Sequence, residues 1–160
     1  MRHYKTGYID IGFFVILIVF VLYLIFMHFK QPVVVTGNSM NPTLTNGQIL
    51  FTTKDFTQDD LHYNDVIYFN SHDTHNKRYI KRIVGLPGDT VQIKNGVFYR
   101  NGEEIKENLP LMQNPGCAKS EIVLGKEQYF VLGDNRNNSN DSRLIGPIEF
   151  SDICGICQIN

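Results

Sequence analysis

The sequence predicts a mainly β protein: an antiparallel β-sheet or barrel-like domain that follows one N-terminal transmembrane helix. Three observations lead to this fold class. Residues 11–29 form an apolar run of membrane length, and many short segments rich in β-branched and aromatic residues follow it at close spacing. No amphipathic helical pattern appears after the run. At 160 residues the chain has room for one ordinary domain beside such a helix.

The apolar run reads IGFFVILIVFVLYLIFMHF, and His28 is its only readily ionisable side chain. About 20 apolar residues are needed to cross the hydrocarbon core of a bilayer. A buried soluble helix seldom stays apolar on every face over such a length. A removable secretion signal would have a shorter apolar region that ends at small residues. We therefore expect an uncleaved transmembrane anchor over residues 11–29.

The charge pattern orients this anchor and argues against one class of partner. Arg2 and Lys5 precede the run, and short basic flanks stay in the cytoplasm. We therefore expect residues 1–10 inside the cell, residues 31–160 outside it, and the lipid bilayer as a partner. The net charge is −1, and without residues 1–30 there are 12 basic and 15 acidic residues. A nucleic-acid surface shows a clear basic excess, so no nucleic-acid partner is expected.

The expected strands follow in order along the rest of the chain. Strand propensity is high at residues 33–35, 48–53, 65–69, 79–84, 91–94, 97–100 and 128–132, and residues 146–159 supply one or two more. Asn95-Gly96 is the strongest short hairpin signal, and Asn101-Gly102 repeats it before residues 103–106. The polar, turn-rich segments 71–76 and 107–120 are expected to be loops.

The three cysteines do not predict a metal or redox site. Cys154 and Cys157 have CxxC spacing, but zinc takes four ligands and no second CxxC or histidine pair completes them. A thioredoxin-like motif would precede a helix, whereas this one lies four residues from the chain end. A terminal strand with incidental cysteines is the better interpretation. Since Cys117 makes the count odd, at least one thiol stays unpaired within a monomer.

Three sequence blocks carry the candidate chemistry: residues 37–44, residues 78–89 and residues 133–143. In the first, Ser39 lies two residues after Gly37 and three residues before Pro42, a pattern typical of a turn that presents its side chain outward. A serine hydroxyl is a poor nucleophile and needs a base. None of the five histidines has a motif context, whereas Lys81 interrupts an apolar strand in the second block. The third block lacks apolar periodicity and is expected to be a loop.

Lys81 meets the requirements for a base if it is buried. Because strand side chains alternate, Tyr79, Lys81 and Ile83 share one face, and the charge of Arg82 points away from it. A free lysine has a pKa near 10.4, so a base near neutrality needs a pKa lower by roughly 3 units, about 4 kcal/mol. Fully buried lysines reach such values. In a strand, however, most lysines extend the ammonium to solvent instead.

The patterns SMxPTL, YIKRIVGLPGD and GDNRxxSxDSRxxG, in this order after one apolar segment, resemble the bacterial type I signal peptidases. These are membrane-anchored serine proteases with a Ser-Lys dyad, and the resemblance covers nearly the whole chain. It implies that Ser39 is the nucleophile and Lys81 the general base. The implied activity removes signal peptides from secreted preproteins after Ala-x-Ala-like sites, at the outer face of the membrane. The resemblance implies no metal or organic cofactor.

The same resemblance assigns supporting roles to the third block. Ser139 matches a serine that hydrogen-bonds and orients the lysine ammonium. Asp141 and Arg143 match a structural salt bridge, and Asp134 is expected to pair with Arg82. The oxyanion hole would use the backbone N–H of the nucleophile.

Some members of the family add an oxyanion donor and share a set of pocket residues. The added donor is a serine hydroxyl two residues before the nucleophile, where this chain has Gly37. The residues that match small-side-chain substrate pockets are Val33, Val35, Met40, Leu44, Tyr79 and Ile80. The resemblance implies preprotein signal peptides as partners, and it allows contacts with the secretion machinery as well.

Other functions stay open to different degrees. An SOS-repressor-type self-cleaving domain would carry a DNA-binding segment in place of the anchor. A eukaryotic-type signal peptidase would have histidine at position 81, where this chain has lysine. A signal-peptidase-like pilus-assembly factor without activity and a narrow pilin-specific protease both remain alternatives.

Overall fold

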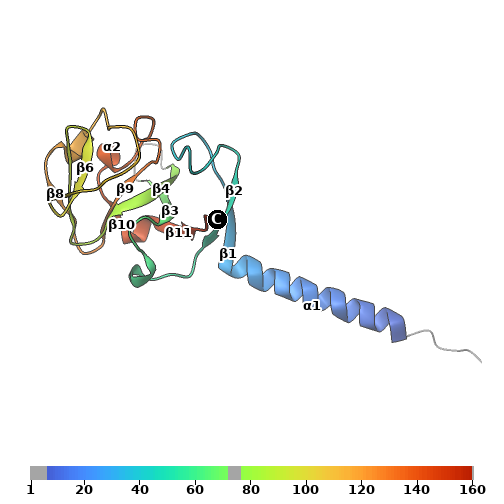
Figure 1. Ribbon diagram of the computed structural model, residues 1–160. Helices are drawn as coiled ribbons and strands as arrows, with labels where there is room; N and C mark the ends of the chain where they lie inside the picture. The colour runs from blue at the N-terminus through green and yellow to red at the C-terminus, as the bar shows by residue number, and fades with distance from the viewer. Residues whose placement is uncertain (1–6, 72–76, 160) are drawn as a thin grey trace, which may run out of the picture.

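The structure is a computed structural model that describes residues 7–71 and 77–159. Helix α1 (Gly7–Phe29) continues directly into strand β1 (Lys30–Val34) and projects away from a β domain (Figure 1). The apolar side chains from Ile11 to Ile25 are exposed along it. Among the described residues, no helix is both long and apolar enough to qualify as a membrane span, so the predicted anchor is not confirmed. Arg2 and Lys5 lie outside the described residues.

The elements after β1 alternate short strands with single turns of helix, where η marks a 3₁₀ helix. In chain order they are β2 (Ile49–Thr53), η1 (Gln58–Asp60), β3 (Val66–Asn70), β4 (Arg78–Gly85), β5 (Thr90–Lys94), β6 (Val97–Arg100), β7 (Glu103–Glu104), η2 (Gly116–Lys119), β8 (Ile122–Val123), β9 (Gln128–Leu132), α2 (Ser142–Ile145), β10 (Ile148–Glu149), η3 (Phe150–Asp152) and β11 (Ile153–Cys157).

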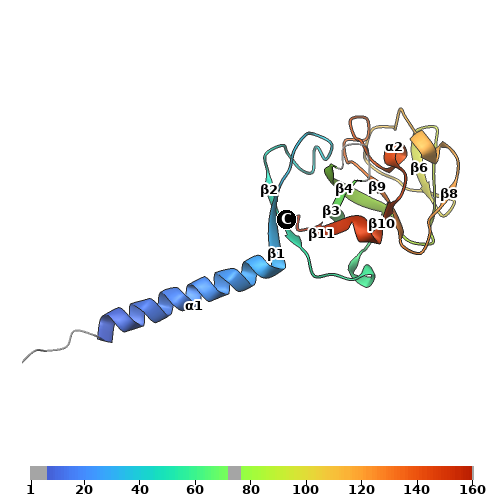
Figure 2. The ribbon, with the colours of Figure 1, turned by 180° about the vertical axis from the view of Figure 1, so that it is seen from behind.

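The described strands form two antiparallel sheets. The larger has seven strands in the order β1-β2-β11-β3-β4-β9-β10, and the smaller has four in the order β7-β6-β5-β8. Both ribbon views place the smaller sheet on the side of the domain far from α1, with β11 ending near β2 (Figures 1 and 2). The predicted mainly β, antiparallel fold is confirmed. The larger sheet contains both β1, which precedes residues 37–44, and β4, which carries Lys81.

Three apolar clusters form the core. One lies between β1, β2, β3 and β4 and contains Met40, Leu44 and Ile80. A second lies where the smaller sheet packs against β9, around Phe98 and Phe130, whose rings stack with centroids 6.5 Å apart. The third fills the other face of the larger sheet. Because the segment carrying Ser39 is built around buried apolar side chains of the first cluster, its backbone is fixed by the core.

The local predictions fare differently according to the strength of their signals. Asn95 and Gly96 have φ of +51° and +80°, as a tight hairpin turn between β5 and β6 requires. The predicted loop 107–120 contains the short helix η2, and β8 was not predicted. The third block was expected to be entirely loop, but α2 begins at Ser142. This helix starts there because the carboxylate of Asp141 accepts the N–H of Arg143 at 3.3 Å and caps it.

Candidate active site

The segment between β1 and β2 holds Ser39 in a folded turn. The N–H of Leu44 donates to the carbonyl of Met40 at 2.9 Å, and both side chains are buried in the first core cluster. The N–H of Gly37 donates to Oδ1 of Asn46 at 2.8 Å. Between these anchors Ser39 is half-buried and borders a groove. The outward presentation expected from the sequence is therefore present.

Lys81 on β4 lies within hydrogen-bond distance of this serine. Its Nζ is 2.8 Å from Oγ of Ser39 and 2.8 Å from the carbonyl oxygen of Ile80. The residue is only 1% exposed, and Nζ lies 5.2 Å from the ring centre of Tyr79. The prediction of a buried lysine among apolar neighbours is confirmed. A short contact between an amine and a serine hydroxyl is the geometry in which a base accepts the hydroxyl proton.

The environment of Lys81 favours the neutral amine. Burial lowers the pKa of Lys81 from 10.5 to about 8, against the opposing attraction of Asp141 and Asp134. With this pKa, about one tenth of the side chain is neutral at pH 7 and about half at pH 8. An uncharged amine at hydrogen-bond distance can serve as a base, whereas an ammonium cannot.

Two ion pairs hold the elements around the lysine. Arg82 donates from Nε and Nη2 to the two carboxylate oxygens of Asp134, at 2.8 Å and 2.6 Å. Burial alone would raise the pKa of Asp134, but hydrogen bonds, first from Arg82, hold it below its usual value. Arg143 donates in the same bidentate way to Asp141, at 2.8 Å for each contact. Both pairs expected from the sequence are present.

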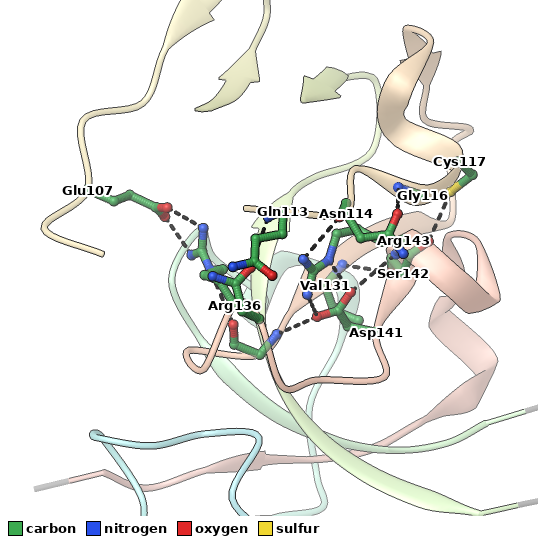
Figure 3. A network of polar contacts seen from close by, with 12 residues as sticks. Glu107, Gln113, Asn114, Gly116, Cys117, Val131, Arg136, Asp141, Ser142 and Arg143 are labelled. Atoms are coloured by element: carbon green, nitrogen blue, oxygen red, sulfur yellow. Dashed lines mark hydrogen bonds and ion pairs between the residues drawn. The ribbon is translucent and has the colours of Figure 1, made fainter. Parts of the chain in front are cut away.

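Asp141 is the centre of the network in Figure 3. Asp141 is fully buried, and its carboxylate also accepts a hydrogen bond from the N–H of Gly133 at 3.1 Å. Next to it, the hydroxyl of Ser142 accepts the N–H of Val131 at 2.9 Å. The third block is therefore a loop ordered by side chains that accept backbone N–H groups.

Replacing Asp141 by alanine is expected to destabilise the domain by about 3–5 kcal/mol, because the nearly buried guanidinium of Arg143 would lose its partner. Urea unfolding of the purified protein measures the effect. The matched control is Glu121→Ala, which removes an exposed carboxylate and is expected to change stability by less than about 0.5 kcal/mol. Equal effects of the two substitutions would contradict this account.

Ser139 departs from its expected role. Its hydroxyl is buried and has no hydrogen-bond partner among the described residues, so the expected bond to Lys81 is absent. The reason is geometric, because Nζ is directed at Ser39 and the Ile80 carbonyl, while Ser139 packs against Gly133. A Cβ on Gly133 would lie 2.2 Å from Oγ of Ser139 and 2.5 Å from the carbonyl oxygen of Ser39. Only a residue without a side chain allows this close approach.

The groove beside Ser39 and Lys81 has a volume of about 580 Å³, and most of the predicted substrate-contact residues line it. Those that line it are Val33, Val35, Met40, Tyr79 and Ile80. Leu44 was predicted to contact substrate, but its side chain is fully buried in the first core cluster and does not line the groove. Leu44 instead stabilises the turn that carries Ser39, because it packs with Met40 in the first core cluster.

Two residues at the site received no role from the sequence. The N–H of Asn135 donates to the carbonyl of Ser39 at 3.0 Å, and its side-chain amide donates to the carbonyl of Asn38 at 3.1 Å. Arg78 lines the groove and donates to the hydroxyl of Tyr68 at 3.0 Å. The only sequence signal for Asn135 was its place in an asparagine-rich block. Its contact with Asn38 joins residues 97 positions apart, and such a contact leaves no local sequence pattern.

Comparisons with known proteins identify the family. Residues 8–160 match the family described as "Signal peptidase, peptidase S26". Signal peptidase I P of Bacillus subtilis subsp. natto is 34% identical over 170 residues, which cover 97% of this chain and 89% of the relative. Signal peptidase I S of Bacillus subtilis (strain 168) is 40% identical over 143 residues, which cover 80% of this chain and 74% of the relative. The crystal structure of a signal peptidase I from Enterococcus faecalis V583 superposes with a TM-score of 0.50 at 28% identity, covering 62% of this chain and 97% of that one.

Proposed function

This chain belongs to the signal peptidase family, peptidase S26, and is a serine endopeptidase that removes signal peptides; from that premise we propose that Ser39 and Lys81 are its catalytic dyad. One observation carries the proposal: the nitrogen of a buried lysine lies 2.8 Å from the hydroxyl oxygen of Ser39. No observation on the described residues favours the pilus-related alternatives.

The dyad performs both halves of a peptide hydrolysis. Neutral Lys81 takes the proton of Ser39 Oγ as that oxygen attacks the scissile carbonyl. The resulting ammonium gives the proton to the leaving amine, and an acyl-enzyme ester remains on the serine. Water then attacks the ester while Lys81 accepts its proton. The ammonium returns that proton to Ser39 Oγ as the ester bond breaks, so the hydroxyl and the neutral amine are both restored.

The oxyanion of each tetrahedral intermediate needs hydrogen-bond donors. The backbone N–H of Ser39 is the proposed donor from the nucleophile itself. Gly37 offers no hydroxyl, and the loss of one such donor corresponds to about 2.7–4 kcal/mol of transition-state stabilisation. The groove must therefore rely on backbone donors or on a side chain other than one at position 37.

Two strand edges border the groove and suit an extended substrate. In the described structure β1 pairs only with β2, and Lys81 pairs with Ile67 of β3, while the pairing of β4 with β9 begins at Arg82. An extended peptide between these edges can form main-chain hydrogen bonds to both. The buried apolar lining of the groove then accommodates small side chains, in agreement with cleavage after Ala-x-Ala-like sites.

We further propose that α1 attaches the enzyme to a membrane, with residues 31–160 at the outer face. The support is the row of exposed apolar side chains from Ile11 to Ile25 on a helix that leads directly into β1 (Figure 1). Arg2 and Lys5 before the helix favour a cytoplasmic N-terminus. Alkaline extraction of membranes tests the attachment, and protease accessibility in intact cells tests the side. Release of the full chain by alkali would refute it.

The main test of the dyad is cleavage of a labelled preprotein by the detergent-solubilised protein, with the cut mapped by mass spectrometry. Ser39→Ala is expected to lower kcat/KM by at least about 10³-fold, since the nucleophile is lost. Normal processing by this variant would refute the assignment. Zero turnover by the folded wild-type protein would revive the reading of an inactive scaffold.

The pH dependence of cleavage gives an independent prediction. Lys81 must be neutral to act, and its pKa is about 8, so kcat/KM is expected to rise with pH through a midpoint near that value. Below the midpoint the rate falls about tenfold for each pH unit. Initial rates between pH 6 and pH 10 measure the profile. A midpoint near the free-lysine value of about 10.4 would contradict the burial argument.

A further inference from the structure

A carboxylate from outside the three sequence blocks reaches the loop that faces Ser39. Glu107, in the loop after β7, accepts hydrogen bonds from both terminal nitrogens of Arg136, the second at 2.7 Å (Figure 3). The side chain of Arg136 is 1% exposed and that of Glu107 is 20% exposed. A bidentate arginine–carboxylate pair fixes orientation as well as distance. Arg136 is therefore held rigidly from the side of the smaller sheet.

Arg136 in turn fixes the backbone of residues 133–135, which contacts Ser39. Its Nε donates to the carbonyl of Gly133 at 3.2 Å, and its own N–H donates to the carbonyl of Asp134 at 3.0 Å. The neighbouring Asn135 donates its N–H to the carbonyl of Ser39 at 3.0 Å. A continuous series of hydrogen bonds thus runs from Glu107 through the residues 133–136 to the proposed nucleophile.

We propose that Glu107 and Arg136 are positioning residues for the reaction: the pair fixes residues 133–136, and these fix the backbone of Ser39 at hydrogen-bond distance from Lys81. This inference rests on the proposed dyad. Glu107 acts only through Arg136, and neither side chain touches the substrate groove.

Among the contacts between the loop 107–120 and residues 133–143, the Glu107–Arg136 pair is an ion pair between two charged side chains. Two other contacts between the loop 107–120 and residues 133–143 are neutral and exposed: the N–H of Gln113 donates to Asn137 at 2.9 Å, and the amide of Asn137 donates to the carbonyl of Leu111 at 3.0 Å. A third joins the charged Arg143 to the neutral carbonyl of Asn114 at 3.3 Å. Without Glu107, the buried guanidinium of Arg136 would lose its bidentate ion-pair partner, and turning toward water would then become favourable. Such a turn pulls on the Gly133 carbonyl. Displacements of about 1 Å in a catalytic group can lower a rate by about 10²-fold.

The test is a double-mutant cycle on preprotein cleavage with Glu107→Gln, Arg136→Gln and the double variant. Glu107→Gln is expected to lower kcat by about 10- to 100-fold while KM stays within about twofold. Since Glu107 acts through Arg136, the double variant is expected to match Arg136→Gln alone. Glu107→Asp, which keeps the charge but shortens the reach, is expected to lower kcat by about three- to tenfold.

The matched control is Asp89→Asn. Asp89 pairs with Arg100 at 2.6 Å beside the smaller sheet, away from the serine. This variant is expected to lower the melting temperature but to leave kcat within about twofold of wild type.

The outcomes separate the proposals. A wild-type protein that does not cut refutes the proposed dyad before the cycle begins. With Ser39-dependent cleavage established, unchanged kcat in the Glu107 variants, or additive effects of Glu107→Gln and Arg136→Gln, overturns the positioning role.

Discussion

Lys81→Met is expected to abolish preprotein cleavage and, at the same time, to make the folded protein more stable at neutral pH. Loss of the proposed general base is expected to lower kcat/KM by about 10²–10⁴-fold, because Ser39 then has no group to take its proton. Methionine has nearly the length of lysine and no charge, so it fills the same buried space. The two effects have one cause, since burial destabilises the ammonium form of Lys81, which costs stability and also leaves more of the amine neutral and able to accept a proton.

The sign and size of the stability effect follow from linkage. The pKa of Lys81 is 10.5 in the unfolded chain and about 8 in the folded one, so the unfolded state binds more protons between these values. Stability of the wild type therefore rises with pH across that window. Below pH 8 the buried charge is unfavourable, and at about 1.36 kcal/mol per pKa unit the amount is on the order of 3 kcal/mol. Lost hydrogen bonds reduce the expected gain of Lys81→Met to about 2 kcal/mol at pH 7.

Urea unfolding of wild type and Lys81→Met at pH 7 and pH 10.5 measures this effect, and the difference is expected to shrink at the higher pH. The control is Ser39→Ala, which also removes activity but retains the buried amine, so its stability is expected to stay within about 1 kcal/mol of wild type. A Lys81→Met protein that is inactive and less stable than wild type at pH 7 would contradict the burial argument.

The strands were predictable because their signals are local or strongly patterned. The strand over residues 79–84 was visible from its apolar run, and Lys81, which interrupts that run, was the candidate base. Asn95-Gly96 specified its hairpin through two positive φ angles. The resemblance to signal peptidases then joined Ser39 to a lysine 42 residues away, a pairing that spacing alone does not predict.

The remaining features depend on contacts between distant segments. Leu44 resembles a pocket residue in sequence, but packing against Met40 buries it in the core. Ser139 carries a hydroxyl in a polar block, and only the folded loop shows it packed against Gly133 without a bond to Lys81. The role of Glu107 has no sequence signal, because its partner lies in a different block and its own surroundings read as a loop.

Gly133→Ala is expected to lower kcat/KM by about 10²-fold or more, through displacement of the nucleophile by one methyl group. The added Cβ would lie 2.5 Å from the carbonyl oxygen of Ser39 and 2.2 Å from Oγ of Ser139. Atoms do not approach so closely, so the backbone of Ser39 or of residue 133 must move. Overpacking of this kind also destabilises a buried site by about 1–3 kcal/mol.

The matched control is Gly125→Ala, where the nearest atom to an added Cβ is 3.3 Å away on the flexible side chain of Gln128. This variant is expected to keep activity within about twofold and stability within about 1 kcal/mol. Cleavage assays and urea unfolding of both variants make the comparison. A Gly133→Ala enzyme with activity within threefold of wild type would show that the close approach does not hold the serine.

A double variant separates the two clashes at Gly133. Adding Ser139→Gly removes the contacts with the Ser139 side chain but leaves the contact with the Ser39 carbonyl. Stability is therefore expected to recover in part, by about 1 kcal/mol, while kcat/KM stays low. Recovery of both together would place the damage at Ser139, and the hydroxyl of that residue would then be what Gly133 accommodates. If only stability recovers, the loss of activity comes from the clash with the Ser39 carbonyl, and Gly133 is needed because it leaves space for the backbone of Ser39.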